Sequence, residues 1–435
     1  MKKIGILGLG KSGVAAANLA VKLGFNVFAS DSGKSSVKGL NKKVKTETGG
    51  HSDKILTSDL IVKSPGLHSD IPVLLKAKKK KIKVLSDLNF SLQYSKYKKI
   101  IAVTGTNGKT TVTDLTSKII KSAFKDSIVT GNIGFPLSDK ALKTTKNTII
   151  TMELSSYQLE DTPDFHPDIS VLLNITPDHL EHHKTMARYI RAKENIFLNQ
   201  KVSDFAVINY DDKILKEISS KTKAKIVFFS KTKLKKGVYW NNGCIIINIG
   251  NKKAEIKPKI NIVGMHNIEN ILAATAAAFC AGVKPKIIEK VISSYKGVEH
   301  RIEFVRNIDG VAYYNDSKST NVDSTRVALE SFEKNILLIM GGLDKGAPYT
   351  PLKKLVAERV KTIYLIGSAA PKIKKDLPNA HFVNSKNIKA AVKHIRKYAN
   401  PGDIALLSPA CASFDQFKNF EERGEKFKKL VLELK

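Results

Sequence analysis

The sequence predicts an α/β protein of three domains. Its 435 residues correspond to about three domains at roughly 150 residues each. Short apolar runs alternate with helical stretches, a pattern that favours parallel sheets joined by crossover helices. The pattern changes character at a lysine-rich polar stretch, 93–99, and again after Gly297-Val298-Glu299. We therefore expect domains at 1–93, 94–298 and 299–435.

The composition excludes several classes of protein. With 42% hydrophobic and 26% charged residues, the chain is predicted to fold and not to stay disordered. No apolar run approaches the roughly 20 residues of a membrane span, and no signal-peptide pattern is visible, so we expect neither membrane insertion nor secretion. Three widely spaced cysteines, Cys244, Cys280 and Cys411, favour the reducing cytoplasm over a disulfide framework.

A formal net charge of +33 points to anionic ligands. The excess is mostly lysine and is dispersed along the chain, and its densest run, 76–83, has no aromatic or arginine side chains with which to read bases. A basic nucleic-acid binder is therefore disfavoured, and we expect no nucleic-acid partner. A positive field does suit the capture of nucleotides.

The first domain opens with a glycine-rich turn between two predicted strands. We expect a strand at 3–8, a helix at 12–23 and a strand at 25–30, with Gly8-Leu9-Gly10-Lys11-Ser12-Gly13 at the first turn. This G-x-G-x-x-G arrangement is typical of dinucleotide binding, in which Asp31 would bind a ribose hydroxyl. The motif leaves the ligand open. An NAD-dependent oxidoreductase, another nucleotide-binding protein and tight strand–helix packing without a ligand all fit it.

The strongest single motif is Gly105-Thr106-Asn107-Gly108-Lys109-Thr110-Thr111. It follows an apolar strand and precedes a predicted helix at 112–121, so its N–H groups and the helix N-terminus can face phosphates. In such a loop Lys109 reaches the outer phosphates and the Thr110 hydroxyl holds Mg²⁺. Val103 occupies the first glycine position of the strict P-loop pattern, which makes this loop a shorter variant.

Polar residues follow five predicted strands at the points where the strands end. They are Glu153 after 148–152, Asn174 after 169–173, Asn315-Asp316 after 311–314, Gly341-Gly342 after 336–340, and Ser408 after 404–407. Ligands of open parallel sheets bind at the carboxyl ends of the strands. We therefore expect active-site construction in both the second and the third domain.

Two of these regions offer metal ligands. A carboxylate, Glu153, and an imidazole, His179, can complete the shell of a phosphate-bound divalent ion. A salt bridge for Glu153 and a capped helix start at Asp178 are the alternatives. The group of His179, His182 and His183 also suggests zinc, which we set aside because neither a cysteine nor a well-placed carboxylate is evident.

Two further residues carry little signal of their own. Lys193 lies in a predicted helix, 187–197, and is one lysine among many. Cys411 has no identifiable histidine partner, so we predict a small buried residue in preference to a nucleophile.

Taken together, these motifs resemble the Mur ligase family across nearly the whole chain. The segments that carry the resemblance are 105–111, 153–159, 174–179, 264–270, 300–303 and 315–321. Two others, Gly341 to Gly346 and Leu407 to Phe417, are similar to the family members that add D-glutamate.

The resemblance implies an ATP-dependent amide ligase of cytoplasmic peptidoglycan precursor synthesis. D-Glutamate would be added to UDP-N-acetylmuramoyl-L-alanine through an acyl phosphate, with ATP as co-substrate and Mg²⁺, or Mn²⁺ as the alternative ion. The resemblance implies a Rossmann-like N-terminal domain for the UDP substrate, a central P-loop-type ATPase domain, and a C-terminal Rossmann-like α/β domain for the amino acid, in a monomeric enzyme. The first glycine turn then serves UDP and not NAD. Folylpolyglutamate synthase, a relative with a similar loop, is disfavoured because it lacks such a first domain.

The resemblance also implies a role for each matching residue. UDP-substrate binding is implied for Ser12, Asp31, Ser32 and Asn132. ATP binding is implied for Gly105, Thr106, Asn107, Gly108, Lys109, Thr110, Thr111, Asn267, His300, Arg301 and Asp316. D-Glutamate binding is implied for Lys318, Thr320, Lys345, Ser413 and Phe420. Lys109, Glu153, His179 and Lys193 are implied to be catalytic, and Thr110, Glu153, His179 and Lys193, the last as a carbamate, to bind the metal.

Overall fold

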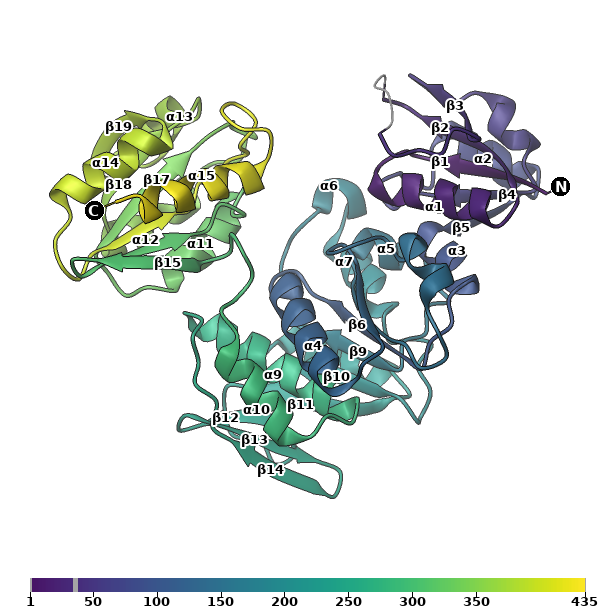
Figure 1. Ribbon diagram of the computed structural model, residues 1–435, viewed down its shortest axis with the longest axis horizontal. Helices are drawn as coiled ribbons and strands as arrows, with labels where there is room; N and C mark the ends of the chain where they lie inside the picture. Colours follow the sequence, from purple (N-terminus) through teal and green to yellow (C-terminus); the bar gives the residue numbers. More distant parts are fainter. Residues whose placement is uncertain (1, 34–37, 435) are drawn as a thin grey trace. The chain divides into compact units, whose positions relative to one another are not determined.

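The computed structural model describes residues 2–33 and 38–434, and its strands form three sheets (Figure 1). The chain divides into two compact units. Unit 1 consists of Met1–Pro258 with Glu269–Ile292, and unit 2 of Lys259–Ile268 with Ser293–Lys435. Each sheet falls within one of the three predicted domain ranges, so the expected α/β architecture is confirmed.

The first sheet of unit 1 is entirely parallel, in the order β3-β2-β1-β4-β5. Its strands are β1 (Lys3–Leu7), β2 (Asn26–Asp31), β3 (Lys45–Thr48), β4 (Leu60–Lys63) and β5 (Lys83–Ser86), and its helices are α1 (Lys11–Lys22), α2 (Pro72–Lys79) and α3 (Asp87–Gln93). Apolar residues of α1 and α3 fill the core on one face, and those of α2 contribute to a second cluster. The glycine turn predicted between the first strand and helix therefore connects β1 to α1.

The second sheet of unit 1 has nine strands, in the order β14-β13-β12-β11-β10-β9-β6-β8-β7. Its parallel strands are β6 (Lys99–Thr104), β7 (Ser127–Gly131), β8 (Ile149–Glu153), β9 (Ile169–Leu172), β10 (Phe205–Asn209), β11 (Lys225–Ser230) and β12 (Gly237–Asn241). The associated helices are α4 (Lys109–Ala123), α5 (Ser156–Glu160), α6 (Leu180–His183), α7 (Met186–Glu194), α8 (Lys213–Ile218), α9 (Met265–Cys280) and α10 (Pro285–Ser294). Two strands the parallel pattern did not predict, β13 (Cys244–Ile249) and β14 (Lys252–Ile256), pair antiparallel. The turn from β12 to β13 is short because Asn242 and Gly243 both take positive φ.

The sheet of unit 2 has the order β15-β16-β20-β17-β18-β19, with β15 alone antiparallel to its neighbour among the described strands. Its strands are β15 (Glu303–Ile308), β16 (Val311–Asn315), β17 (Ile336–Gly341), β18 (Val360–Ile366), β19 (Phe382–Lys386) and β20 (Ile404–Leu407). Its helices are α11 (Val322–Glu330), α12 (Lys353–Arg359), α13 (Ala370–Asp376), α14 (Ile388–Tyr398) and α15 (Phe420–Leu432).

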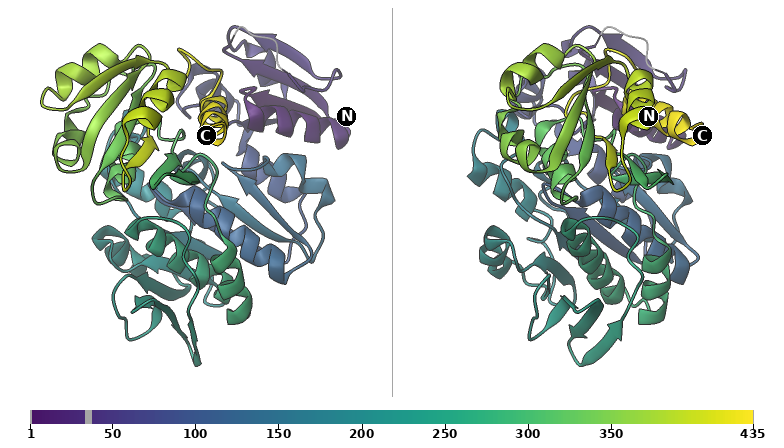
Figure 2. Two further views of the ribbon diagram at one scale, coloured as in Figure 1. Left: turned by 60° about the vertical axis from the view of Figure 1, so that its left-hand side comes forward. Right: turned by 90° about the vertical axis from the view of Figure 1, so that its left-hand side faces the viewer.

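The central strand β17 shows why this sheet is covered on both faces (Figures 1 and 2). Ile336, Leu338 and Met340 belong to the core cluster that includes residues of α11, α12 and α13. The alternate residues Leu337 and Ile339 belong to the cluster that includes residues of α14 and α15. A continuous apolar strand is therefore buried on both sides, as parallel sheets require. None of the helices in the described part of the chain combines the length and the apolar character of a membrane span.

Candidate active site

The predicted phosphate loop connects β6 to the N-terminus of α4. Gly108 has φ +83° at the cap of α4, a conformation that favours glycine. A Cβ atom added at Gly108 would lie 2.3 Å from Asn270 Oδ1, so a larger residue would also clash. Thr110 and Thr111 lie in the first turn of α4, where free backbone N–H groups and the helix dipole favour phosphate.

Asn174, at the end of β9, fixes this loop from a distant part of the chain. Its Oδ1 accepts hydrogen bonds from the backbone N–H groups of Thr106 at 3.1 Å and Asn107 at 2.8 Å. Its Nδ2 donates to Asn107 O at 3.1 Å, which completes a two-way clamp. Asn174 was expected to follow a strand but was not predicted to be a site residue.

Two lysines lie against the phosphate loop. Lys109 Nζ donates to the carbonyls of Gly105 at 2.9 Å and Thr106 at 2.7 Å. Lys193, from α7, is 1% exposed, and its Nζ donates to Gly105 O at 2.8 Å. Burial, with a smaller contribution from the positive charge of Lys109, holds the pKa of Lys193 well below its usual range. One of the two amines at the phosphate loop is therefore buried, which favours its neutral form.

Glu153, at the end of β8, has the features of a cation ligand. It is 1% exposed, and its Oε1 accepts a hydrogen bond from Asn132 Nδ2 at 3.0 Å. Its Oε2 is buried and finds no hydrogen-bond partner among residues 2–33 and 38–434. A carboxylate oxygen left in this state beside a phosphate loop fits a site for a hard divalent ion. The predicted salt bridge, the alternative for Glu153, does not occur among these residues.

His179 caps α6 in the left-handed conformation, with φ +52°. Its ring packs edge-on against that of Tyr157, at 5.1 Å between centroids, and its Nε2 lies 3.5 Å from Asp178 Oδ2. The side chain is 43% exposed. The helix start expected at Asp178 lies one residue later, because His179 takes the capping position.

The glycine turn of the first sheet borders a cavity of about 600 Å³. The lining residues are Leu9, Gly10, Lys11, Val14, Ala15, Asn18, Asp31, Lys38, Gly39, Gly134, Phe135, Pro136 and Asp139. Asp31 also accepts hydrogen bonds from the backbone N–H groups of Leu9 and Gly33, which ties the turn to the end of β2. Ser32 is exposed beside it, and Ser12 hydrogen-bonds Asp87, whose pKa burial raises to about 6.

In unit 2, the predicted site residues lie on loops at the carboxyl ends of neighbouring strands. The loop after β17 pairs with the loop after β20 through the bridge between Leu343 and Ala412. Lys318 Nζ lies 6.0 Å from the centre of the Phe420 ring. Thr320 and Lys345 lie on the loops after β16 and β17, and Ser413 is buried on the loop after β20.

Arg423 holds these loops together and was missed by the sequence analysis. It is 1% exposed, and its guanidinium donates to the carbonyls of Ser317, Cys411 and Ala412 and to Ser317 Oγ. Nothing in the sequence around it distinguishes this arginine from those on helix surfaces. One buried cation thereby fixes two of the loops on which the predicted D-glutamate residues lie.

The residues predicted for the nucleoside side of ATP in unit 2 are each held by neighbouring residues of that unit. Asp316 is fully buried and accepts hydrogen bonds from Ile302 N at 3.2 Å and Ser408 Oγ at 2.7 Å. Burial raises the pKa of Asp316 to about 6, and the charge of Arg301 opposes that rise. His300 is buried with φ +64° and contacts Asn315 Nδ2 at 2.9 Å through Nδ1. Asn267 Nδ2 donates to Val263 O at 2.6 Å.

Cys411 is a buried structural residue, as predicted. It is 1% exposed, its thiol contacts the hydroxyl of Tyr349 at 3.0 Å, and burial raises the pKa of the thiol to about 11.

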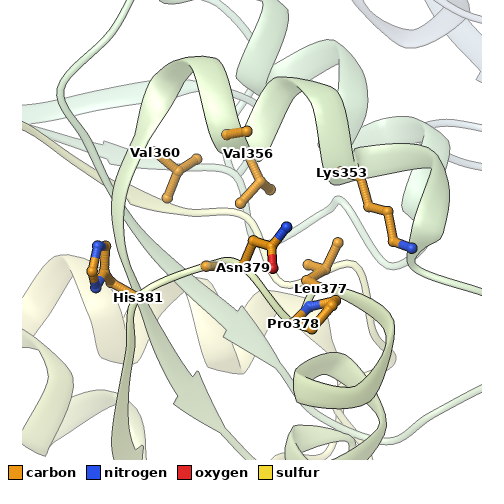
Figure 3. A pocket seen from close by; sticks show the side chains of 9 residues that line it. Lys353, Val356, Val360, Leu377, Pro378, Asn379 and His381 are labelled. Atoms are coloured by element: carbon orange, nitrogen blue, oxygen red, sulfur yellow. The ribbon is translucent and has the colours of Figure 1, made fainter.

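Another cavity, in unit 2 and of about 300 Å³, lies between α12 and the segment 377–381 (Figure 3). It is lined by Lys353, Val356, Ala357, Val360, Leu377, Pro378, Asn379, Ala380 and His381, and no predicted site residue is among them.

The sheets and the strand–loop–helix at 105–111 define an α/β protein whose predicted site residues lie at strand ends. Three family models match the chain in order: a MurD-like N-terminal domain of Mur ligases at residues 2–86, the Mur ligase middle domain at 103–278, and the Mur ligase glutamate ligase domain at 300–411. The chain belongs to the Mur ligase family.

Alignments with relatives at 43% and 44% identity cover 99% and 100% of this chain. It is 44% identical to the UDP-N-acetylmuramoylalanine–D-glutamate ligase of Elusimicrobium minutum, with 100% of this chain and 98% of that protein covered. It is 43% identical to the enzyme of the same name from Koribacter versatilis, with 99% and 97% covered. A crystal structure of MurF ligase from Thermotoga maritima in complex with ADP superposes with a TM-score of 0.62 at 18% identity, covering 99% and 95%. This last comparison supports the fold alone.

Proposed function

We propose that this chain is the ligase that joins D-glutamate to UDP-N-acetylmuramoyl-L-alanine at the expense of ATP, in the cytoplasmic synthesis of peptidoglycan precursors. The substrate identities rest on relatives at 43% and 44% identity that are UDP-N-acetylmuramoylalanine–D-glutamate ligases. The observation that carries the chemistry is the phosphate loop with Glu153 and Lys193 buried beside it. We assign the UDP substrate to 1–93, ATP to 94–298 and the amino acid to 299–435.

The reaction activates a carboxylate by transferring a phosphoryl group to it. The L-alanyl carboxylate attacks the γ-phosphorus of ATP, ADP leaves, and the amine of D-glutamate then displaces phosphate from the acyl phosphate. Both first reactants are anions, and two such charges 4 Å apart repel by roughly 1 kcal/mol in water and by several times that in a drier site. The N–H groups of the loop, the N-terminus of α4 and Lys109 offset that repulsion.

Thr110, Glu153, His179 and Lys193 are the residues we assign to a divalent ion. The orphaned Oε2 of Glu153 is the observation that fits it. When bound, Mg²⁺, or Mn²⁺ in its place, would neutralise phosphate charge. The lowered pKa of Lys193 favours the neutral amine, the form that adds carbon dioxide to give a carbamate. That addition would place an anionic oxygen ligand beside the loop.

In unit 2, two lysines suit an amino acid that has two carboxylates. Lys318 and Lys345 provide cations on the loops after β16 and β17, and Thr320 and Ser413 provide hydroxyls. The side chains of His300, Arg301 and Asp316, together with Asn267, are assigned to the adenosine part of ATP. In unit 1, Ser12, Asp31, Ser32 and Asn132 are assigned to the UDP substrate, and of these Asp31 lines the cavity of about 600 Å³ at the glycine turn.

Phosphate release from ATP tests the proposal. With UDP-N-acetylmuramoyl-L-alanine present, D-glutamate should support release, and L-glutamate and L-lysine should not. The variant Lys109→Ala should lose ATP turnover and keep binding of the UDP substrate, because Lys109 lies on the phosphate loop and not at the glycine turn. Equal turnover with all three amino acids would refute the assigned specificity, and loss of both ligands in the variant would refute the assignment of substrates to domains.

A further inference from the structure

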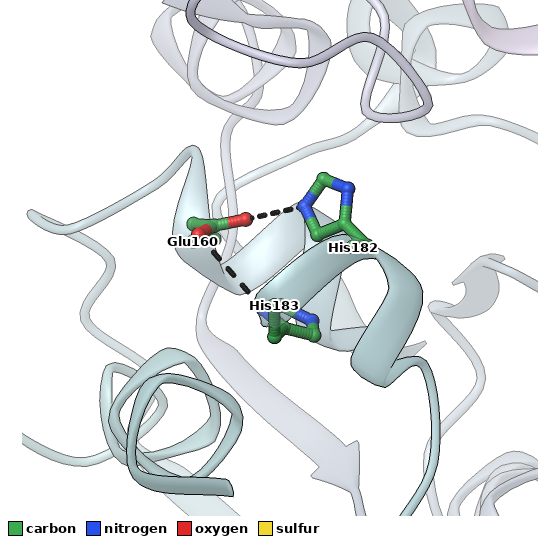
Figure 4. Close-up of side chains that lie close together, drawn as sticks. All are labelled: Glu160, His182 and His183. Atoms are coloured by element: carbon green, nitrogen blue, oxygen red, sulfur yellow. Dashed lines mark hydrogen bonds and ion pairs between the residues drawn. The ribbon is translucent and has the colours of Figure 1, made fainter. Parts of the chain in front are cut away.

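A cluster of potential metal ligands lies where α5 and α6 end (Figure 4). Glu160 is the last residue of α5, and His182 and His183 are the last two of α6. His182 Nε2 lies 2.8 Å from Glu160 Oε2, and His183 Nδ1 lies 3.9 Å from Glu160 Oε1. One ligand atom from each of the three residues lies within 4.8 Å of the others.

The ring of His183 has one nitrogen that is satisfied and one that is not. Its side chain is fully buried, and Nε2 contacts Ser156 Oγ at 2.9 Å. Nδ1, the nitrogen that faces Glu160, is buried and lacks a hydrogen-bond partner within the described part of the chain. An imidazole nitrogen enclosed in this way, beside a carboxylate at 3.9 Å, is a coordination position that a cation can occupy.

The distances fit a small tetrahedral ion. Metal–ligand bonds of about 2.0 to 2.1 Å place tetrahedral ligand atoms roughly 3.3 Å apart. The two observed contacts to Glu160, at 2.8 and 3.9 Å, lie on either side of that separation. The outer nitrogens are also held: His183 Nε2 contacts Ser156, and His182 Nδ1 lies 3.2 Å from His68 Nε2. Such partners orient ligating histidines and fix their tautomers.

We propose that Glu160, His182 and His183 form a binding site for a borderline divalent cation such as Zn²⁺, with solvent at the fourth position. Two imidazoles and one carboxylate are a zinc ligand set, whereas magnesium prefers oxygen ligands alone. The residues assigned to Mg²⁺ at the phosphate loop include one imidazole, His179, whereas this cluster offers two. The sequence alone disfavoured zinc because no carboxylate was evident, and α5 supplies one in Glu160. A bound ion would connect α5 to α6, the helix that His179 caps.

Zinc titration of the metal-free full-length protein in excess Mg²⁺ tests the site, because Mg²⁺ keeps Zn²⁺ from the phosphate-loop ligands. Wild type should bind one equivalent with high affinity in competition with a chromogenic chelator. Glu160→Gln and His182→Gln should each weaken binding by more than about 100-fold, since each removes a ligand. Both side chains are partly exposed, at 44% and 10%, so these variants should fold.

The matched control is His166→Gln. His166 is a histidine of the same unit that contacts a carboxylate, Asp204 Oδ2, at 2.7 Å, but lies outside the cluster. The His166→Gln variant should bind Zn²⁺ as wild type does. The proposal is overturned if wild type binds no high-affinity equivalent, or if Glu160→Gln and His182→Gln bind as tightly as His166→Gln does. Co²⁺ provides a second readout, because tetrahedral coordination by wild type should give visible absorption that both ligand variants lose.

Discussion

The phosphate loop of unit 1 and the loop cluster of unit 2 both lie at the carboxyl ends of parallel strands, yet they are held in opposite ways. At the phosphate loop, a neutral side-chain amide, Asn174, holds the backbone, and the ionisable groups beside it, Glu153 and Lys193, are buried. In unit 2, a buried cation, Arg423, holds the backbone, and one of the lysines assigned to substrate, Lys345, is exposed.

The two sites differ in which of their groups are buried. Unit 1 buries its reactive groups, and burial holds the pKa of Lys193 well below its usual range before any ligand binds. Unit 2 buries the cation that holds its loops, and the lysine Lys345, assigned to amino-acid recognition, is exposed. Substitutions in the two sites should therefore fail differently: in unit 1 through lost chemistry, and in unit 2 through lost structure and weakened amino-acid binding.

The largest effect is expected for Lys193→Met. Removing the amine that we assign to the metal site should lower kcat by roughly 100- to 1,000-fold. The fold should survive, because methionine fills the volume and needs no hydrogen bonds. A short carboxylate such as acetate should restore part of the activity if the working form is the carbamate. The control is Lys221→Met, which removes an exposed lysine paired with Glu194 at 2.6 Å and should keep full activity.

Lys193→Met also tests how the stability of the protein depends on pH. The pKa of Lys193 in the folded chain lies well below the usual 10.5, so the unfolded chain binds more protons at pH values between the two. Wild-type stability should therefore rise with pH through that window, and Lys193→Met should not show this rise. Full activity in the unassisted variant would contradict the role in catalysis, and an unchanged pH dependence would contradict a buried neutral amine.

Arg423→Met should fail through lost structure and weakened amino-acid binding. It leaves the carbonyls of Ser317 and Cys411 without a donor, while Ala412 O keeps the N–H of Leu343 at 2.9 Å, and the loss should cost roughly 3 kcal/mol. KM for D-glutamate should rise by about tenfold or more. Arg359→Met is the control, because Arg359 also donates to three carbonyls of unit 2, away from the predicted D-glutamate residues. Equal KM changes in the two variants would show a general loss of stability.

Asp316→Asn should change how stability depends on pH. The rise in the pKa of Asp316 from 3.8 to about 6 corresponds to about 3 kcal/mol. The folded carboxyl keeps its proton to higher pH than the unfolded one. Its contribution to the free energy of unfolding is therefore complete below pH 3.8 and is lost as pH rises through about 6. Amide hydrogen exchange of β16 and β20 should show this decline in wild type and not in the variant. Asp87→Asn, at a carboxyl of similar pKa in unit 1, should leave the decline in unit 2 intact.

The sequence predicted what local pattern determines. The strand, loop and helix around 105–111 and the polar residues at strand ends are visible because each signal spans a few neighbouring residues. Asn174 and Arg423 were missed as site residues because their roles depend on contacts across 67 and 106 residues. Their hydrogen bonds exist only after the strands that position them have paired. The burial of Lys193, which sets its pKa, has the same origin.

The smallest effect is expected for Asn174→Ala, which tests the neutral clamp of unit 1. Both backbone N–H groups lose the Asn174 Oδ1 acceptor, but Thr106 N–H keeps its bond to Asn174 O at 2.9 Å, and a bound phosphate can accept from Asn107 N–H. ATP affinity should fall by about tenfold, or 1.4 kcal/mol, mostly through the cost of ordering the loop. Calorimetric titration with ATP measures it. Asn195→Ala, which removes a hydrogen bond to Leu159 O at 2.9 Å away from the loop, should bind ATP as wild type does. If Asn174→Ala also bound ATP normally, the loop would be preformed by its own backbone, and the contrast with the arginine-held loops of unit 2 would be one of degree only.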